Sequence, residues 1–205
     1  DDPEPKYGMV AVGEVNVENL VTVTSAQAGD LLVLTKALGT GVVATAIKAD
    51  AASDTATAAA VKSMTTLNRE AADAMKSVGV RAATDVTGFG LLGHLSNLLL
   101  QSGVAAELVA EKVPVLPEVP ELIADGHIPG GTRRNLEDLE DRIEFGDQDE
   151  TPRLILADAQ TSGGLLISVP EGRAEELMEL LEPDSPVAAI IGRVTDGAPG
   201  TIKVV

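Results

Sequence analysis

The sequence of 205 residues contains no cysteine and no tryptophan, and its aromatic residues are Tyr7, Phe89 and Phe145. The lack of cysteine excludes disulfides, zinc–thiolate centres and thiol nucleophiles within this chain. Long apolar runs are also missing, since none approaches the roughly 18 residues of a membrane-spanning helix, and no signal-peptide pattern is visible. We therefore expect a cytoplasmic protein without a membrane partner, whose core is built from aliphatic side chains.

Basic residues are scarce as well. The chain has 15 Lys and Arg against 32 Asp and Glu, which gives a formal net charge of −17. Such a charge repels DNA, RNA and anionic lipid, so we expect no nucleic-acid partner. Small anions can still bind where backbone N–H groups converge. With 44% hydrophobic residues, the chain is long enough for one large domain or for one and a half small ones.

Predicted strands and helices alternate along the chain, which indicates helices layered on a sheet. Ser53 is a good cap for a long helix reaching residue 77, and Gly79 is a good end for it. The apolar stripe expected on that helix comprises Ala60, Met64, Leu67, Ala71, Met75 and Val78. Strands are predicted at 7–15, 20–24, 31–35, 81–86, 104–109, 165–169, 188–194 and 201–205. The other helices are predicted at 41–48, 90–101, 119–125, 136–145, 152–157 and 171–181, and residues 129–135 are predicted to form a loop.

The segment A-T-D-V-T-G-F-G-L-L-G-H-L, which starts at Ala83, carries the clearest chemical signal. Asp85 stands at the end of a predicted strand, a glycine-rich turn follows, and a helix then begins. A carboxylate is a ligand for a hard divalent cation, and a helix N-terminus offers free N–H groups to phosphate. The segment therefore predicts a metal and phosphate site, although an Asp that only caps the following helix would fit the same pattern.

Two further segments make the pattern specific. They are P-G-G-T-R-R-N, which starts at Pro129, and D-A-Q-T-S-G-G-L-L, which starts at Asp158. With these three motifs in this order, the chain resembles selenophosphate synthetase (selenide, water dikinase). P-E-P at Pro3, L-T-K-A-L-G-T-G at Leu34 and M-T-T-L-N at Met64 match the same family. Ala159 stands where the family usually has proline.

The resemblance covers the C-terminal part of a family member. It implies an α+β fold, a three-layer α/β/α sandwich with ferredoxin-like character, as in the superfamily of aminoimidazole ribonucleotide synthetase. Residues 1–20 would be the tail of an N-terminal ATP-binding domain, and residues 21–205 the C-terminal domain. The family's catalytic Cys or selenocysteine and its Lys belong to the N-terminal part, so this chain alone is expected to be inactive. The expected partners are that domain and a second copy, in a homodimer.

The resemblance also implies the reaction and the site residues. ATP, selenide and water would give selenophosphate, AMP and phosphate, with Mg²⁺ as cofactor and ATP as substrate. Asp85 would be a metal ligand, and no catalytic residue is assigned in this chain. The expected ATP contacts are Lys36, Thr87, Gly88, Thr132, Arg134 and Asn135.

Each of these assignments has a structural alternative. Lys36 can be a solvated lysine, and Thr132 or Asn135 can cap a helix. Arg133 occupies the variable position of its motif and can pair with nearby acids. His94 is expected to bond a neighbouring backbone group, because phosphoryl transfer depends mainly on positioning and charge neutralisation.

Two other functions stay open at this stage. One is a different enzyme of the same ATP-binding superfamily, such as aminoimidazole ribonucleotide synthetase or the hydrogenase-maturation dehydratase. The other is a non-catalytic module that binds a partner or a nucleotide.

Overall fold

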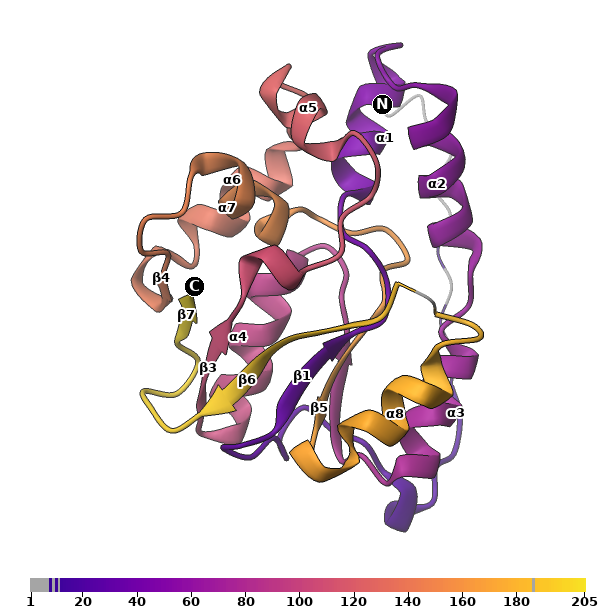
Figure 1. The fold of residues 1–205 in the computed structure, drawn as a ribbon, viewed down its shortest axis with the longest axis vertical. Helices are drawn as coiled ribbons and strands as arrows, with labels where there is room; N and C mark the ends of the chain where they lie inside the picture. The colour runs from indigo at the N-terminus through magenta and orange to yellow at the C-terminus, as the bar shows by residue number, and fades with distance from the viewer. Residues whose placement is uncertain (1–7, 9, 11, 186) are drawn as a thin grey trace.

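The computed structural model describes residues 8, 10, 12–185 and 187–205 (Figure 1). Within these residues seven strands form one sheet, in the order β2-β5-β1-β6-β3-β7-β4. The strands are β1 (Leu31–Leu34), β2 (Ala82–Asp85), β3 (Ala105–Leu108), β4 (Ile143–Glu144), β5 (Leu165–Val169), β6 (Ala189–Thr195) and β7 (Ile202–Val204). The α-helices are α1 (Thr40–Lys48), α2 (Asp54–Thr65), α3 (Arg69–Val78), α4 (Gly90–Ser102), α5 (Val119–Ala124), α6 (Gly130–Glu137), α7 (Glu150–Ala157) and α8 (Ala174–Leu181).

The ferredoxin-like character expected from the sequence is confirmed in four of the strands. β2, β5, β1 and β6 are neighbours in that order, and every adjacent pair is antiparallel. α3 lies between β1 and β2 along the chain, and α8 lies between β5 and β6. This is the βαββαβ arrangement. The segment between β2 and β5 is a long insertion, and it adds β3 and β4 beyond the β6 edge.

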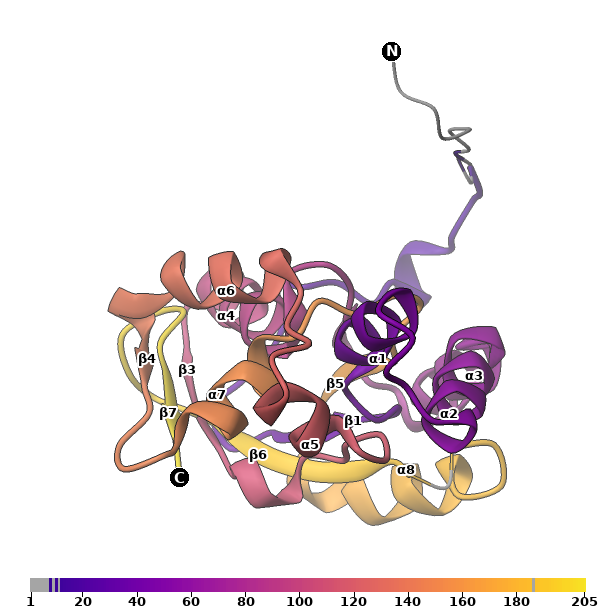
Figure 2. The same ribbon diagram turned by 90° about the horizontal axis from the view of Figure 1, so that it is seen from above.

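The two faces of the sheet bury different groups of helices. Alternate residues of β1 point to opposite faces: Leu32 and Leu34 join the core that includes α1, α4 and α7, whereas Val33 packs with α3 and α8. Figure 1 shows α3 and α8 side by side, and Figure 2 shows α4 and α8 on opposite sides of the sheet. The three-layer α/β/α sandwich is therefore confirmed.

The long helix predicted over residues 53–77 is wrong, because α2 and α3 are separate helices. The capping of α2 by Ser53 is confirmed, and the helix ends at Thr65 with an extended Thr66. Gly79 ends α3 in the left-handed conformation, as expected. The break lets the chain pass from one face of the sheet to the other: Ala60 packs in the first core and Ala71 in the second. Leu67 lies at the break and is 64% exposed, so it is not a core residue.

Two other predictions are also corrected. Residues 129–135 were expected as a loop, but α6 begins at Gly130 within this motif and ends at Glu137. The packing of Thr132 and Asn135, one turn apart on the buried face, offsets the low helix propensity of two glycines. The acidic helix expected over 136–145 is also wrong, because α6 ends at Glu137. Successive acids at a helix C-terminus oppose the helix dipole. β4 follows there and pairs with β7.

The strand expected over residues 7–15 falls only in part within the described residues. Tyr7, Met9 and Ala11 of the strand expected over 7–15 lie outside the described residues, and Gly8, Val10 and residues 12–15 are not in a strand. A strand needs a neighbour for its backbone groups, and no described residue pairs with them. Of the strand expected over 20–24, Thr22 alone forms an isolated bridge, to Ala82. In the described part of the chain, no helix is both long and apolar enough to cross a bilayer.

Candidate phosphate and metal site

The sequence motifs meet at one end of the sheet. β1 and β2 end there, and the antiparallel β5 begins there. The Thr35 N–H donates to the carbonyl of Leu165 at 3.1 Å, and the Val86 N–H donates to the carbonyl of Gly164 at 2.9 Å. The segments that begin at Leu34, Thr84 and Asp158 are therefore adjacent in space, although they lie far apart in the sequence.

A buried carboxylate connects these segments. Asp158 has no exposed surface. Its Oδ2 accepts from the N–H groups of Gly41 (3.1 Å) and Val42 (3.4 Å) in the first turn of α1. Its Oδ1 accepts from the Thr132 hydroxyl of α6 at 3.0 Å. The same carboxylate thus joins the N-terminus of α1, α6 and the turn that leads into β5.

Gln160 extends the connection toward the Asp85 segment. Its side-chain N–H donates to Asp158 Oδ2 at 2.9 Å, and its side-chain oxygen accepts from Gly39 N–H at 3.2 Å and from the Thr40 hydroxyl at 3.1 Å. Its backbone N–H donates to the carbonyl of Thr87 at 3.0 Å. Every polar group of this side chain is therefore used within the protein.

Burial raises the pKa of Asp158 to about 6, and the hydrogen bonds from Thr132, Val42, Gln160 and Gly41 oppose this shift. In the unfolded chain the pKa is near 3.8, so between these values the folded state binds a proton that the unfolded state does not. The contribution of this group to the free energy of unfolding therefore increases as the pH falls through 6.

This linkage predicts that acidification from pH 7 to pH 5 adds about 1 kcal/mol to the free energy of unfolding through Asp158. Asp158→Asn removes that increment and leaves the contributions of the other carboxylates in place. Urea unfolding of both proteins at the two pH values measures the difference. Equal pH dependence in the two proteins would contradict the assignment of this pKa.

Asp85 is exposed at the end of β2, as the sequence predicts. Nearby, Thr87 Oγ1 and His94 Nε2 are 3.0 Å apart, so the partner of His94 is a side-chain hydroxyl rather than the expected backbone group. Burial lowers the pKa of His94, and the charge of Asp85 acts in the opposite direction. Gly88 is also exposed, and no atom lies within 4 Å of the position that a Cβ would occupy there. The Asp85 segment therefore presents one carboxylate and open backbone to solvent.

This donor set is suitable for one part of a metal site. A carboxylate oxygen is a ligand for Mg²⁺, and the exposed position of Asp85 leaves it accessible. Over the described ranges, no group of three or more His, Cys, Asp or Glu side chains is arranged to hold a metal ion. Asp85 could therefore supply one ligand, and the other ligands of such a site would have to come from outside the described residues.

Lys36 is buried, being only 6% exposed, and is not a solvated lysine. Its ammonium group donates to the carbonyls of Thr66 (2.7 Å) and Ser162 (2.9 Å), and burial lowers its pKa. Ser162 adopts the left-handed backbone conformation with φ 51°, so this bond holds the turn before β5 in an unfavourable geometry. Lys36 therefore ties the end of α2 to that turn.

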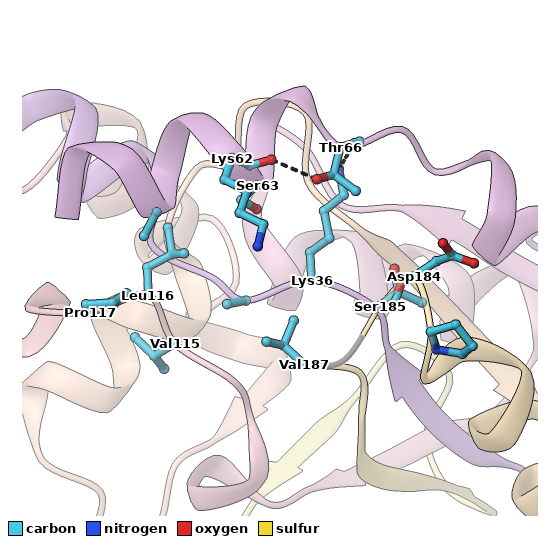
Figure 3. A pocket seen from close by; sticks show the side chains of 14 residues that line it. Lys36, Lys62, Ser63, Thr66, Val115, Leu116, Pro117, Asp184, Ser185 and Val187 are labelled. Carbon is cyan, nitrogen blue, oxygen red and sulfur yellow. Dashed lines mark hydrogen bonds between the residues drawn. The ribbon is translucent and has the colours of Figure 1, made fainter. Parts of the chain in front are cut away.

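Lys36 also lines a cavity of about 600 Å³. Figure 3 shows Lys62 and Thr66 of the α2 segment on one side and Asp184 and Ser185 on another. Val115 and Leu116 form part of its apolar lining.

The residues of the P-G-G-T-R-R-N motif divide into two groups. Thr132 is fully buried against Asp158, and the Asn135 amide donates to the carbonyls of Gly88 (2.9 Å) and Ala157 (3.0 Å). Arg134 is exposed and has no ion pair among the described residues, whereas Arg133 lies 3.9 Å from Glu150. Of this motif, Arg134 therefore presents its charge to solvent, outside any ion pair of the described residues.

Asn68 also holds the turn that leads into β5, a role that the sequence analysis did not predict. Its amide donates to the carbonyl of Gly163 at 2.9 Å, and its buried oxygen has no hydrogen-bond partner among the described residues. The match of M-T-T-L-N to the family was the available signal, but it did not assign a role to this residue.

Comparison with known proteins identifies the domain. Residues 27–205 match the family model described as AIR synthase related protein, C-terminal domain. A selenide, water dikinase from Myxococcus xanthus is 45% identical over 202 residues, which cover 97% of this chain and 57% of the relative. A selenide, water dikinase from Porphyromonas gingivalis is 46% identical over 198 residues, 96% of this chain and 57% of the relative. The chain therefore spans a little over half the length of these curated relatives.

Solved structures share the fold at lower identity. A crystal structure of the hydrogenase maturation protein HypE has a TM-score of 0.63 and 22% identity, covering 93% of this chain and 53% of that one. Thiamine-monophosphate kinase from Stenotrophomonas maltophilia has a TM-score of 0.59 and 20% identity, covering 90% of this chain and 52% of that one. These likenesses concern the fold alone. The family match extends over most of the sequence, and the chain therefore belongs to the AIR synthase related proteins, of which it forms the C-terminal domain.

Proposed function

We propose that this chain is the C-terminal part of a selenophosphate synthetase, which converts ATP, selenide and water to selenophosphate, AMP and phosphate. The observation that carries the proposal is the 45% identity to a selenide, water dikinase over 97% of the chain. The convergence of the family's motifs around Asp85 supports it, because residues that serve one site have to meet in space. HypE has also been solved in complex with ATP, and that structure has a TM-score of 0.62 to this chain.

In this proposal the chain contributes charge and positioning rather than a reacting group. Asp85 is one ligand of Mg²⁺, which neutralises phosphate charge when bound. Arg134 and the backbone N–H groups of Thr87 and Gly88 contact the phosphates of ATP. Three of the residues expected to contact ATP support the site indirectly, because their polar groups bond to the protein itself: Thr132, Asn135 and Lys36. Residues 1–20 belong to the N-terminal ATP-binding domain, which is the proposed partner of residues 21–205.

The 205-residue chain alone is expected to form no AMP from ATP and selenide, whereas the full-length protein is expected to do so. The reason is that the described residues offer one accessible carboxylate and no metal-binding cluster at the site. Nucleotide analysis with and without selenide measures both proteins. Turnover by the short chain at the rate of the full-length protein would contradict the assignment, and a full-length protein without selenide-dependent AMP formation would overturn the proposed function.

We also propose a homodimer formed through the N-terminal segment. Val10, Val12 and Val17 are 91%, 94% and 82% exposed, and Figure 2 shows residues 12–16 leading away from the domain. An extended valine-rich segment with free backbone groups is a template for pairing with another chain. Light scattering is expected to give a dimer for the 205-residue chain and a monomer after removal of residues 1–20. A monomer in both cases would contradict the proposal.

A further inference from the structure

Asp158 is buried, and no side chain in the described part of the chain forms an ion pair with it. Its hydrogen-bond donors among the described residues are all neutral: two backbone N–H groups, a hydroxyl and a side-chain amide. A buried carboxylate that lacks a positive partner lowers stability unless hydrogen bonds satisfy it. A neutral side chain of similar size would avoid that cost, so the carboxylate requires an explanation beyond core packing.

The bonds of Asp158 join α1 and α6 to the turn that carries Asp158. Oδ2 bonds to the first turn of α1, and Oδ1 bonds to α6 through Thr132. A carboxylate at a helix N-terminus is also favoured by the helix dipole. One side chain therefore fixes the distance between two helices and the turn that precedes β5.

The same turn also bonds to the two residues that follow Asp85. The Gln160 N–H bonds to the carbonyl of Thr87, and the carbonyl of Gly164 accepts from the Val86 N–H. Because Gln160 is itself bonded to Asp158 Oδ2 at 2.9 Å, a shift of the carboxylate is transmitted to the residues that immediately follow Asp85. The connection consists of two side chains and one backbone bond.

We infer that Asp158 is the positioning residue of this site: it sets the location of the Asp85 carboxylate by holding α1, α6 and the 158–164 turn together. This inference rests on the proposed function for its effect on turnover, but the mechanical connection from Asp158 to Thr87 stands without it. Asp158 touches neither metal nor ATP in this view and acts through Gln160.

The test compares two buried carboxylates in the full-length protein. Asp158→Asn keeps the size of the side chain and removes its charge. Asp30→Asn is the matched control, because Asp30 is also buried and accepts from Ser168 Oγ (2.7 Å) and Gln27 N–H (3.1 Å), but it lies at the opposite end of β1. Both variants lose charge-assisted hydrogen bonds. The comparison therefore separates a general loss of stability from an effect on the position of the Asp85 segment.

Two measurements decide the inference. In Asp158→Asn, hydrogen exchange is expected to become about tenfold faster at the amides of Gly41, Val42 and Gln160. The Mg²⁺ concentration for half-maximal ATP turnover is expected to rise about tenfold, the lower end of the effect of losing a group that orients a metal ligand. Asp30→Asn is expected to change neither.

Unchanged exchange at Gln160 in Asp158→Asn would overturn the inference, because the connection to Thr87 would then be absent. An equal rise in the Mg²⁺ requirement of Asp30→Asn would also overturn it, since the effect would be one of stability. If the wild-type full-length protein shows no selenide-dependent turnover, the proposed function fails, and the exchange measurement alone decides the role of Asp158.

Discussion

Replacing Asp85 by asparagine in the full-length protein is expected to reduce ATP turnover about a hundredfold, which corresponds to about 2.7 kcal/mol of transition-state stabilisation. The side chain is exposed at the end of β2, so its charge contributes little to folding. An amide of the same size keeps the shape but loses the anionic oxygen that a hard cation prefers. The free energy of unfolding is expected to change by less than about 0.5 kcal/mol.

Glu144→Gln provides the matched control for this experiment. Glu144 is also an exposed acid at the end of a strand, β4, which lies at the far edge of the sheet. The control variant is expected to keep wild-type turnover across a Mg²⁺ titration, with the thermal midpoint recorded in parallel. Wild-type turnover in Asp85→Asn would remove this residue from the metal site.

The sequence was sufficient to predict elements whose signals are local. The strand expected over 165–169 is β5 (Leu165–Val169), bounded by Gly164 and Pro170. The Ser53 cap and the Gly79 end are also local signals, and both are confirmed. The break at Thr66 was not predictable in this way, because the bonds that hold it come from Lys36 and from the turn before β5. The periodic apolar stripe continues through the break, since each half faces a different core.

The same distinction between local signals and long-range contacts applies to the candidate site. The position of Asp85 followed from its place at the end of a strand, which sequence patterns indicate well. The orientation of Thr132 and Asn135 did not follow, because the motif was expected to be a loop and is a helix. A loop leaves polar side chains free to contact a ligand, whereas one face of this helix points inward to Asp158 and Ala157. Spacing alone does not distinguish these two cases.

Glycines were a second source of ambiguity. In the sequence, they indicated close approach of the backbone to phosphate. In the structure, a Cβ at Gly164 would lie 2.6 Å from the backbone nitrogen of Lys36 and 2.8 Å from Thr35 Oγ1. A glycine is therefore needed there because one strand end approaches another. Gly88 differs, since the space around it is open.

Gly164→Ala is accordingly expected to lower the free energy of unfolding by about 3 kcal/mol or more, because the added methyl group meets backbone and cannot be accommodated by a change of rotamer. Gly88→Ala is expected to change it by less than about 0.5 kcal/mol and to reduce ATP turnover instead, since the methyl group would occupy the space proposed for phosphate. Urea unfolding and turnover of both full-length variants measure this contrast. If Gly88→Ala retained wild-type turnover, the backbone at Gly88 would not approach the nucleotide. If Gly164→Ala were as stable as the wild type, the close packing of the β1 and β5 ends would not be what requires a glycine.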